Sequence, residues 1–101
     1  MPLTICTLGR DGTPDDELDI GPDAHVLLQA EAGRLGLPLL SRIHDYYEDV
    51  DFSPDEVAAL ITEAEVMRQR GDWRIVPWLG DLVALASRTI RKKAGLAVIS
   101  D

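Results

Sequence analysis

The chain has 101 residues, of which 46% are hydrophobic and 28% charged, and its formal net charge is −8 at pH 7. This length allows one domain with a single hydrophobic core, and this composition excludes a chain that is disordered throughout. Thirteen of the 18 acidic residues lie in residues 1–56 beside only three arginines, which gives that segment a net charge of −10, whereas residues 57–101 carry +2. An acidic surface repels nucleic acid, so we expect no nucleic acid partner and favour a basic protein as the partner.

The cysteine content and the hydropathy of the chain indicate in which cellular compartment the protein is expected. Cys6 is the single cysteine, so no disulfide can form within the chain, and a reducing environment is favoured. The N-terminal region lacks a basic stretch followed by an apolar one, and no run approaches the roughly 18 apolar residues that a membrane span needs. We therefore expect a cytoplasmic protein without a membrane partner.

The N-terminal quarter of the chain predicts a strand followed by a loop. Leu3 to Leu8 is β-branched and apolar and stops at Gly9, as is typical of a short strand. Residues 9–23 contain three glycines, two prolines and six acidic residues. Because this composition interrupts both helical and strand periods, we expect an exposed loop there.

Two helices are predicted next. Strong helix formers from His25 to Gly33 favour a helix with Asp23 as its N-cap, although alternating apolar residues leave a strand as the alternative. After Pro38 a short helix is predicted, with an apolar side made of Leu39, Leu40, Ile43, Tyr46 and Tyr47.

The clearest local pattern is the capping box formed by Ser53 and Glu56, with Pro54 at the first helical position. Phe52 and Val57 form the accompanying hydrophobic staple. Apolar residues then recur at helical spacing until the glycine at position 71, so this segment predicts a long amphipathic helix whose other side, including Glu63, faces away from the core. The members of its apolar side are Val57, Leu60, Ile61, Ala64 and Met67.

A second long amphipathic helix is predicted at residues 77–94, after a tight connection at residues 72–76. The three cations at positions 91–93 complement the dipole of its last turn, and Gly95 is expected in a left-handed cap. Leu96 to Ser100 then predicts a short buried strand. The predicted fold class is therefore α+β: one small domain over residues 1–101, with two long amphipathic helices, shorter helices, and short strands near the two chain ends. Whether those strands pair is left open.

Residues 44–51 combine a histidine with four carboxylates. On a helix, His44 and Glu48 stand four residues apart, as do Asp45 and Asp49, so a hard cation is one candidate ligand. The spacing matches no calcium loop, so metal binding ranks below a solvated helix side and below an acidic surface for a partner.

Two further residues carry potential chemistry. His25 suits acid or base catalysis only if Asp23 or Glu31 orients it, and a position on the helix surface is the favoured interpretation. Cys6 could act as a nucleophile with His25 or His44, but a thiol in the middle of a strand usually packs as a small apolar side chain.

Both tryptophans, Trp73 and Trp78, flank the connection at residues 71–80. If exposed they would be binding anchors, but burial at the end of the small core is the favoured interpretation. The three cations at positions 91–93 are too few to track a phosphate backbone in so acidic a chain.

Residues 37–65, LPLLSRIHDYYEDVDFSPDEVAALITEAE, resemble a pattern found in small acidic bacterial proteins of unknown function, some of them immunity-protein-like. In that pattern an apolar Pro-Leu segment precedes an acidic turn, a Ser-Pro cap and a Leu-rich helix. The matching residues here are Pro38, Leu39, Asp49, Phe52, Ser53, Pro54 and Glu56. The resemblance covers under a third of the chain and implies no catalytic residue.

Together these observations favour a non-enzymatic acidic binding protein, such as an immunity-type inhibitor of a basic toxin or enzyme, without a cofactor. The alternatives are a self-associating structural subunit with a dimer contact on the helix at residues 77–94 and, ranked last, a small metal-dependent enzyme using His44. Whether the acidic segments converge in space is left open. The candidate partner-binding residues are Asp15, Asp16, Glu17, Asp45, Glu48, Asp49, Asp51 and Trp73.

Overall fold

The computed structural model describes residues 3–8, 14–43 and 50–100, which form a four-stranded sheet and a layer of helices. The strands are β1 (Leu3–Leu8), β2 (Pro14–Ile20), β3 (Val50–Phe52) and β4 (Leu96–Ser100). The helices are α1 (Pro22–Leu35), α2 (Pro38–Ser41), α3 (Pro54–Arg70), the 3₁₀-helix η1 (Trp73–Ile75) and α4 (Val76–Arg91). The predicted α+β class is confirmed. No helix in the described ranges is long and apolar enough to cross a membrane.

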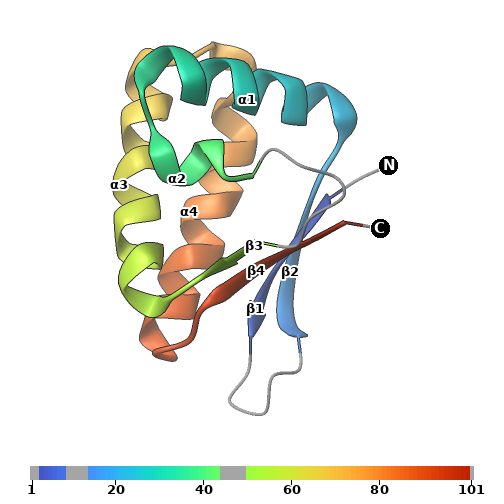
Figure 1. Cartoon of the computed structure of the whole chain (residues 1–101), viewed down its shortest axis with the longest axis vertical. Helices are drawn as coiled ribbons and strands as arrows, with labels where there is room; N and C mark the ends of the chain where they lie inside the picture. Colours follow the sequence, from blue (N-terminus) through green and yellow to red (C-terminus); the bar gives the residue numbers. More distant parts are fainter. Residues whose placement is uncertain (1–2, 9–13, 44–49, 101) are drawn as a thin grey trace.

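The sheet has the strand order β2-β1-β4-β3, and every neighbouring pair is antiparallel. The two strands near the chain ends, β1 and β4, therefore pair directly at the centre. The described helices lie together on one side of the sheet, with α3 and α4 side by side and α1 across their upper ends (Figure 1). The edge strands β2 and β3 are thus separated by two central strands.

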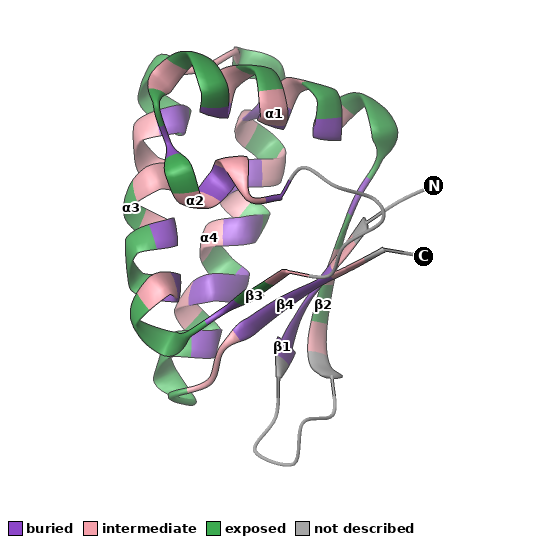
Figure 2. Ribbon diagram, viewed as in Figure 1, coloured by how far each residue is buried: buried purple, intermediate pink, exposed green. Residues whose placement is uncertain are grey.

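The core lies between the helices and one face of the sheet. Buried positions on α3 and α4 recur at helical spacing and face inward (Figure 2). Ile5 of β1 pairs with Val98 of β4, and both are buried in the same core cluster. Since side chains alternate along a strand, residues 5, 7, 96 and 98 face the helices and residues 4, 6, 97 and 99 face the opposite side. The sheet therefore has a helix-covered face and a second face that none of the described helices covers.

Both long amphipathic helices are confirmed, and so is the capping box. The Ser53 side chain accepts a hydrogen bond from the Glu56 amide, and the Glu56 carboxylate accepts one from the Ser53 amide. Because the Ser53 amide donates to the Glu56 carboxylate, and Arg42 donates to it as well, the pKa of Glu56 lies below the usual value. Phe52 and Val57, the predicted staple pair, are both buried in the core. The predicted strands at Leu3–Leu8 and Leu96–Ser100 are confirmed in place and length.

The prediction of a loop at residues 9–23 is wrong for most of the residues of this segment that the structure describes. Pro14–Ile20 forms β2, and α1 begins at Pro22. The acidic composition hides a two-residue period, in which Leu18 and Ile20 point to the core while Glu17 and Asp19 point away. An edge strand with one solvated face needs only those two apolar positions.

Two predicted helix caps also need correction. The segment after residue 21 is a helix, as favoured, but its N-cap is Gly21 instead of Asp23, and it continues past Gly33 to Leu35, where Gly36, with φ 69°, is its left-handed C-cap. At the end of α4 the left-handed residue is Lys93, with φ 54°, instead of Gly95. Gly95 serves another purpose, because a Cβ there would lie 2.5 Å from the Phe52 carbonyl oxygen. It permits β4 to approach the end of β3.

Candidate functional site

The strand register brings two acidic positions from distant parts of the chain onto one face of the sheet. Cys6 pairs with Glu17 on one side and with Ala97 on the other, and Ala97 pairs with Asp51. Directly paired residues of antiparallel strands point to the same face. Residues 17, 6, 97 and 51 therefore form one row across the face that looks away from the described helices.

A second row lies next to the first. Thr4 pairs with Asp19 of β2 and with Ile99 of β4, and its hydroxyl donates a 2.8 Å hydrogen bond to Asp19 Oδ1. Glu17, Asp19 and Asp51 are all exposed. We call these three residues the acidic face. Two lie on edge strand β2 and one on edge strand β3, about 14 Å apart for three strand spacings.

The pKa of Cys6 is affected by the two carboxylates in its row, those of Glu17 and Asp51. The Cys6 side chain is only 1% exposed. Burial raises the pKa of the Cys6 thiol, and the negative charges of Glu17 and Asp51 raise it further. Both carboxylates therefore act on one point of the sheet, and they leave Cys6 a protonated, poorly nucleophilic thiol. The predicted apolar packing of Cys6 is confirmed.

Asp16, another predicted partner-binding residue, points to the opposite face of β2. Arg88 of α4 donates a 2.6 Å hydrogen bond from Nε to Asp16 Oδ2. This bond holds the pKa of the Asp16 carboxyl below its usual value. Since a paired carboxylate has less charge to offer a partner, Asp16 serves to attach β2 to α4 and stands apart from the acidic face.

The backbone of both edge strands is bonded to the protein's own side chains. On β2 the Glu17 amide donates to Asp16 Oδ1 at 3.1 Å, and the Asp19 carbonyl accepts from the Trp78 indole at 3.0 Å. On β3 the Asp51 carbonyl accepts from Arg42 Nη2 at 2.8 Å. A partner strand needs such backbone groups to extend a sheet. These contacts disfavour strand addition and leave the acidic face as the accessible feature.

Several of the remaining predicted site residues lie outside the part of the chain that the structure describes: Asp45, Glu48, Asp49 and the side chain of Asp15. The same holds for the tyrosines at positions 46 and 47, which were predicted on the apolar side of a short helix. Trp73, for which burial was favoured, is 78% exposed, so that interpretation is wrong. Trp78 is partly buried against the core. Trp73 lies in the short connection between α3 and α4, whereas Trp78 lies in the first turn of α4.

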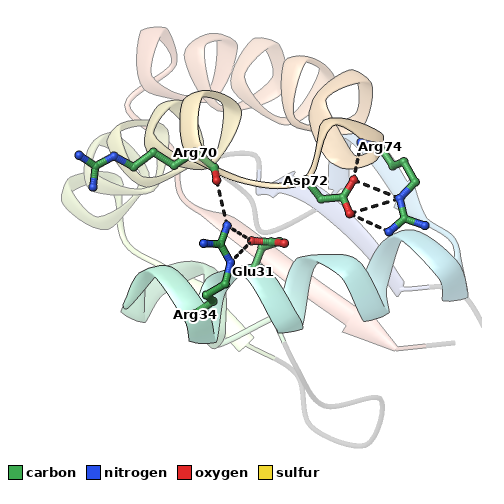
Figure 3. A network of polar contacts seen from close by, with 5 residues as sticks. All are labelled: Glu31, Arg34, Arg70, Asp72 and Arg74. Carbon is green, nitrogen blue, oxygen red and sulfur yellow. Dashed lines mark hydrogen bonds and ion pairs between the residues drawn. The ribbon is translucent and has the colours of Figure 1, made fainter.

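Trp73 begins a 3₁₀ turn that its neighbours fix in place (Figure 3). Asp72 caps this turn by accepting from the Arg74 amide at 2.9 Å, and its carboxylate also receives Nε and Nη2 of the Arg74 side chain. These hydrogen bonds lower the pKa of Asp72 to about 2. Nearby, Arg34 donates to the carbonyl of Arg70 at the end of α3, and pairs with Glu31.

His25 is 1% exposed, so the predicted position on the helix surface is wrong. Its Nε2 lies 2.8 Å from the Ile43 carbonyl oxygen, a contact that ties α1 to the segment after α2. The imidazole can therefore replace an apolar side chain in the core without leaving Nε2 unbonded. Within the described ranges no three His, Cys, Asp or Glu side chains are grouped to hold a metal ion, and His44 lies outside those ranges.

Two contributions were not anticipated from the sequence. Asp19 belongs to the acidic face, and its two-residue spacing from Glu17 was the available signal. Glu63, predicted to face away from the core on α3, accepts from the amides of Leu39 and Leu40 at 3.0 Å and so caps α2. No spacing in the sequence links residue 63 to residue 39.

No family model, no curated protein and no solved structure matches this chain. The resemblance of residues 37–65 to immunity-like proteins stays a prediction.

Proposed function

We propose that this protein is a non-enzymatic binding protein that presents its acidic face to a basic protein. An immunity-type inhibitor of a basic toxin or enzyme is the specific form that we favour, in a cytoplasmic setting consistent with the free Cys6. The observation that carries the proposal is the exposure of Glu17, Asp19 and Asp51 on one face of the sheet, at both of its edges.

The physical basis is electrostatic steering. A chain of net charge −8 attracts a basic partner over distances of about a Debye length, and carboxylates gathered on one face orient the encounter. Inhibition needs no chemistry from the inhibitor, because covering a cationic cleft is enough to exclude its substrate. This accords with a single cysteine that is buried and flanked by carboxylates.

The self-associating subunit remains the second candidate, but its predicted surface is used elsewhere. The apolar side of α4 was expected to form a dimer contact. Leu79, Leu82, Leu85 and Ala86 on that side are buried in the protein's own core. A dimer would therefore need another surface.

The test compares two double charge reversals used as bait in affinity capture from native cytoplasm. Glu17→Lys with Asp51→Lys alters the acidic face, whereas Asp55→Lys with Asp81→Lys makes the same change in net charge at exposed positions on α3 and α4. We expect wild type and the α3/α4 variant to retain a basic protein in low salt, and the acidic-face variant to lose it.

The captured protein is then purified and its association rate measured against salt. We expect the rate for wild type to fall steeply with salt, and to be about tenfold or more below wild type for the acidic-face variant at low salt. Equal capture by both variants, or capture that is insensitive to salt, would contradict the proposal.

A further inference from the structure

A shallow hollow lies between α1 and η1. It is lined by Asp23, Ala24, Val26, Leu27 and Arg74. Its floor is apolar, and it carries one carboxylate from the first turn of α1 and one guanidinium from η1. We call this feature the α1–η1 hollow.

Exposed apolar side chains gather in this part of the chain. Among the described residues the most exposed large hydrophobic side chains are Trp73, at 78%, and Val26, at 64%. Val26 lines the hollow, and Trp73 precedes the lining residue Arg74. Exposed apolar side chains mark a contact surface where they lie close together, and tryptophan is enriched among the anchors of such surfaces.

The η1 side of the hollow is rigid. The Asp72 carboxylate bonds both the amide and the guanidinium of Arg74, and so fixes the turn that carries Trp73 (Figure 3). Binding through groups that are already ordered costs little conformational entropy. These bonds therefore hold the backbone of the turn and the Arg74 guanidinium in one arrangement.

The two charged residues that line the hollow, Asp23 and Arg74, are complementary in a two-fold contact; Arg74 is bonded to Asp72 of its own chain, but its side chain remains 58% exposed. In a two-fold symmetric contact, a residue at one position meets its counterpart at another position on the second copy, and the reverse. A two-fold axis through the hollow would set Asp23 of each copy opposite Arg74 of the other, with the apolar floors facing each other. The acidic face has no such balance, because two copies meeting there would oppose carboxylate to carboxylate.

We propose that a second copy of this chain docks in the α1–η1 hollow through a two-fold contact, with Trp73 and Val26 as its apolar anchors and Asp23 paired with Arg74 across the axis. The contact is small, as in complexes that form weakly and reversibly. This inference does not depend on the proposed function.

The test is sedimentation equilibrium of the full chain up to about 1 mM, the range of the weakest specific complexes. We expect the average mass of wild type to rise with concentration towards that of a dimer. Asp23→Lys alone and Arg74→Glu alone each place like charges across the axis, so each should stay monomeric. An equimolar mixture of these two variants should recover the dimer, because each then faces its opposite charge.

Two controls keep the test decisive. The recovery in the mixture cannot come from misfolded chains, and Val26→Lys, which leaves the η1 hydrogen bonds intact, should also abolish the dimer. Ile90→Ser removes a third exposed apolar side chain, on α4, and should leave the dimer unchanged. A wild type that is monomeric throughout, a mixture that stays monomeric, or a dimer that only Ile90→Ser disrupts would overturn the proposal.

Discussion

The two faces of the sheet differ in how their polar groups are used, and the edge strand β2 shows both. Asp16 faces the helices and is bonded to Arg88, whereas its neighbour Glu17 faces the other side and is exposed. The central strand repeats the difference. Thr7, on the helix-covered face, is bonded through its hydroxyl to Thr89, whose own proton goes to the Leu85 carbonyl. Polar groups on the covered face hold the layers together, whereas the carboxylates of Glu17, Asp19 and Asp51 on the other face are exposed.

The largest change in stability is expected for substitutions on β3, where the neighbours Asp51 and Phe52 point to opposite faces of the sheet. Phe52 is 2% exposed in the core, with the Arg42 guanidinium 4.7 Å from its ring centroid. Phe52→Ala should lower the free energy of unfolding by about 3–5 kcal/mol because it leaves a cavity. Asp51→Ala should change it by no more than about 0.5 kcal/mol, as is usual for an exposed position. Urea denaturation measures both, and equal effects would contradict the assignment of faces.

The close approach of β3 and β4 predicts the next effect. Gly95→Ala places a Cβ against the Phe52 carbonyl, and the forced shift should lower stability by about 1–3 kcal/mol. Gly33→Ala is the matched control, since no atom lies within 4 Å of its Cβ and the position is helical. That control should raise stability by about 0.5–1 kcal/mol. Thermal unfolding of both variants would reveal a tolerant Gly95 if this account were wrong.

The turn from β3 into α3 gives a smaller effect. Ser53→Ala removes the side-chain acceptor for the Glu56 amide and should lower the free energy of unfolding by about 1 kcal/mol. Ser53→Asp retains an acceptor and should keep most of the wild-type stability. A loss of the same size in Ser53→Asp would show that the cap itself contributes nothing.

The smallest effect concerns the Asp16 and Arg88 pair, and it depends on pH. The pKa of Asp16 is lowered in the folded protein, so the pair contributes stability above the ordinary carboxyl value near 4, and this contribution is lost as pH falls through the lowered value. Asp16→Asn should therefore reduce the melting temperature at neutral pH and approach wild type in acid. Arg88→Gln should do the same, and the double variant should add nothing. A difference from wild type that does not shrink as the pH falls below 4 would point to another cause.

Sequence patterns predicted the parts of the fold in which local chemistry decides the structure. The capping box at Ser53 and the apolar spacing of both long helices needed no information from elsewhere in the chain. β2 was missed because its apolar positions, Leu18 and Ile20, become visible as a strand only when β1 is there to pair with it.

The acidic face was predicted in part, for a similar reason. Glu17 and Asp51 were both candidates, but their position on one face follows from the pairing of four strands, which no local pattern encodes. Asp16 has the same composition signal as Glu17, and only the strand period separates their roles. The exposure of Trp73 follows from the geometry of a three-residue turn, which residue type alone does not reveal.

The most direct test of the acidic face is the salt dependence of the association rate with the captured basic partner, measured by stopped flow for wild type and for the two double reversals. We expect Glu17→Lys with Asp51→Lys to remove most of the salt dependence and most of the rate at low salt. Asp55→Lys with Asp81→Lys, which has the same net charge, should remain closer to wild type. Two variants that slow association equally would show that total charge, and not this face of the sheet, governs binding.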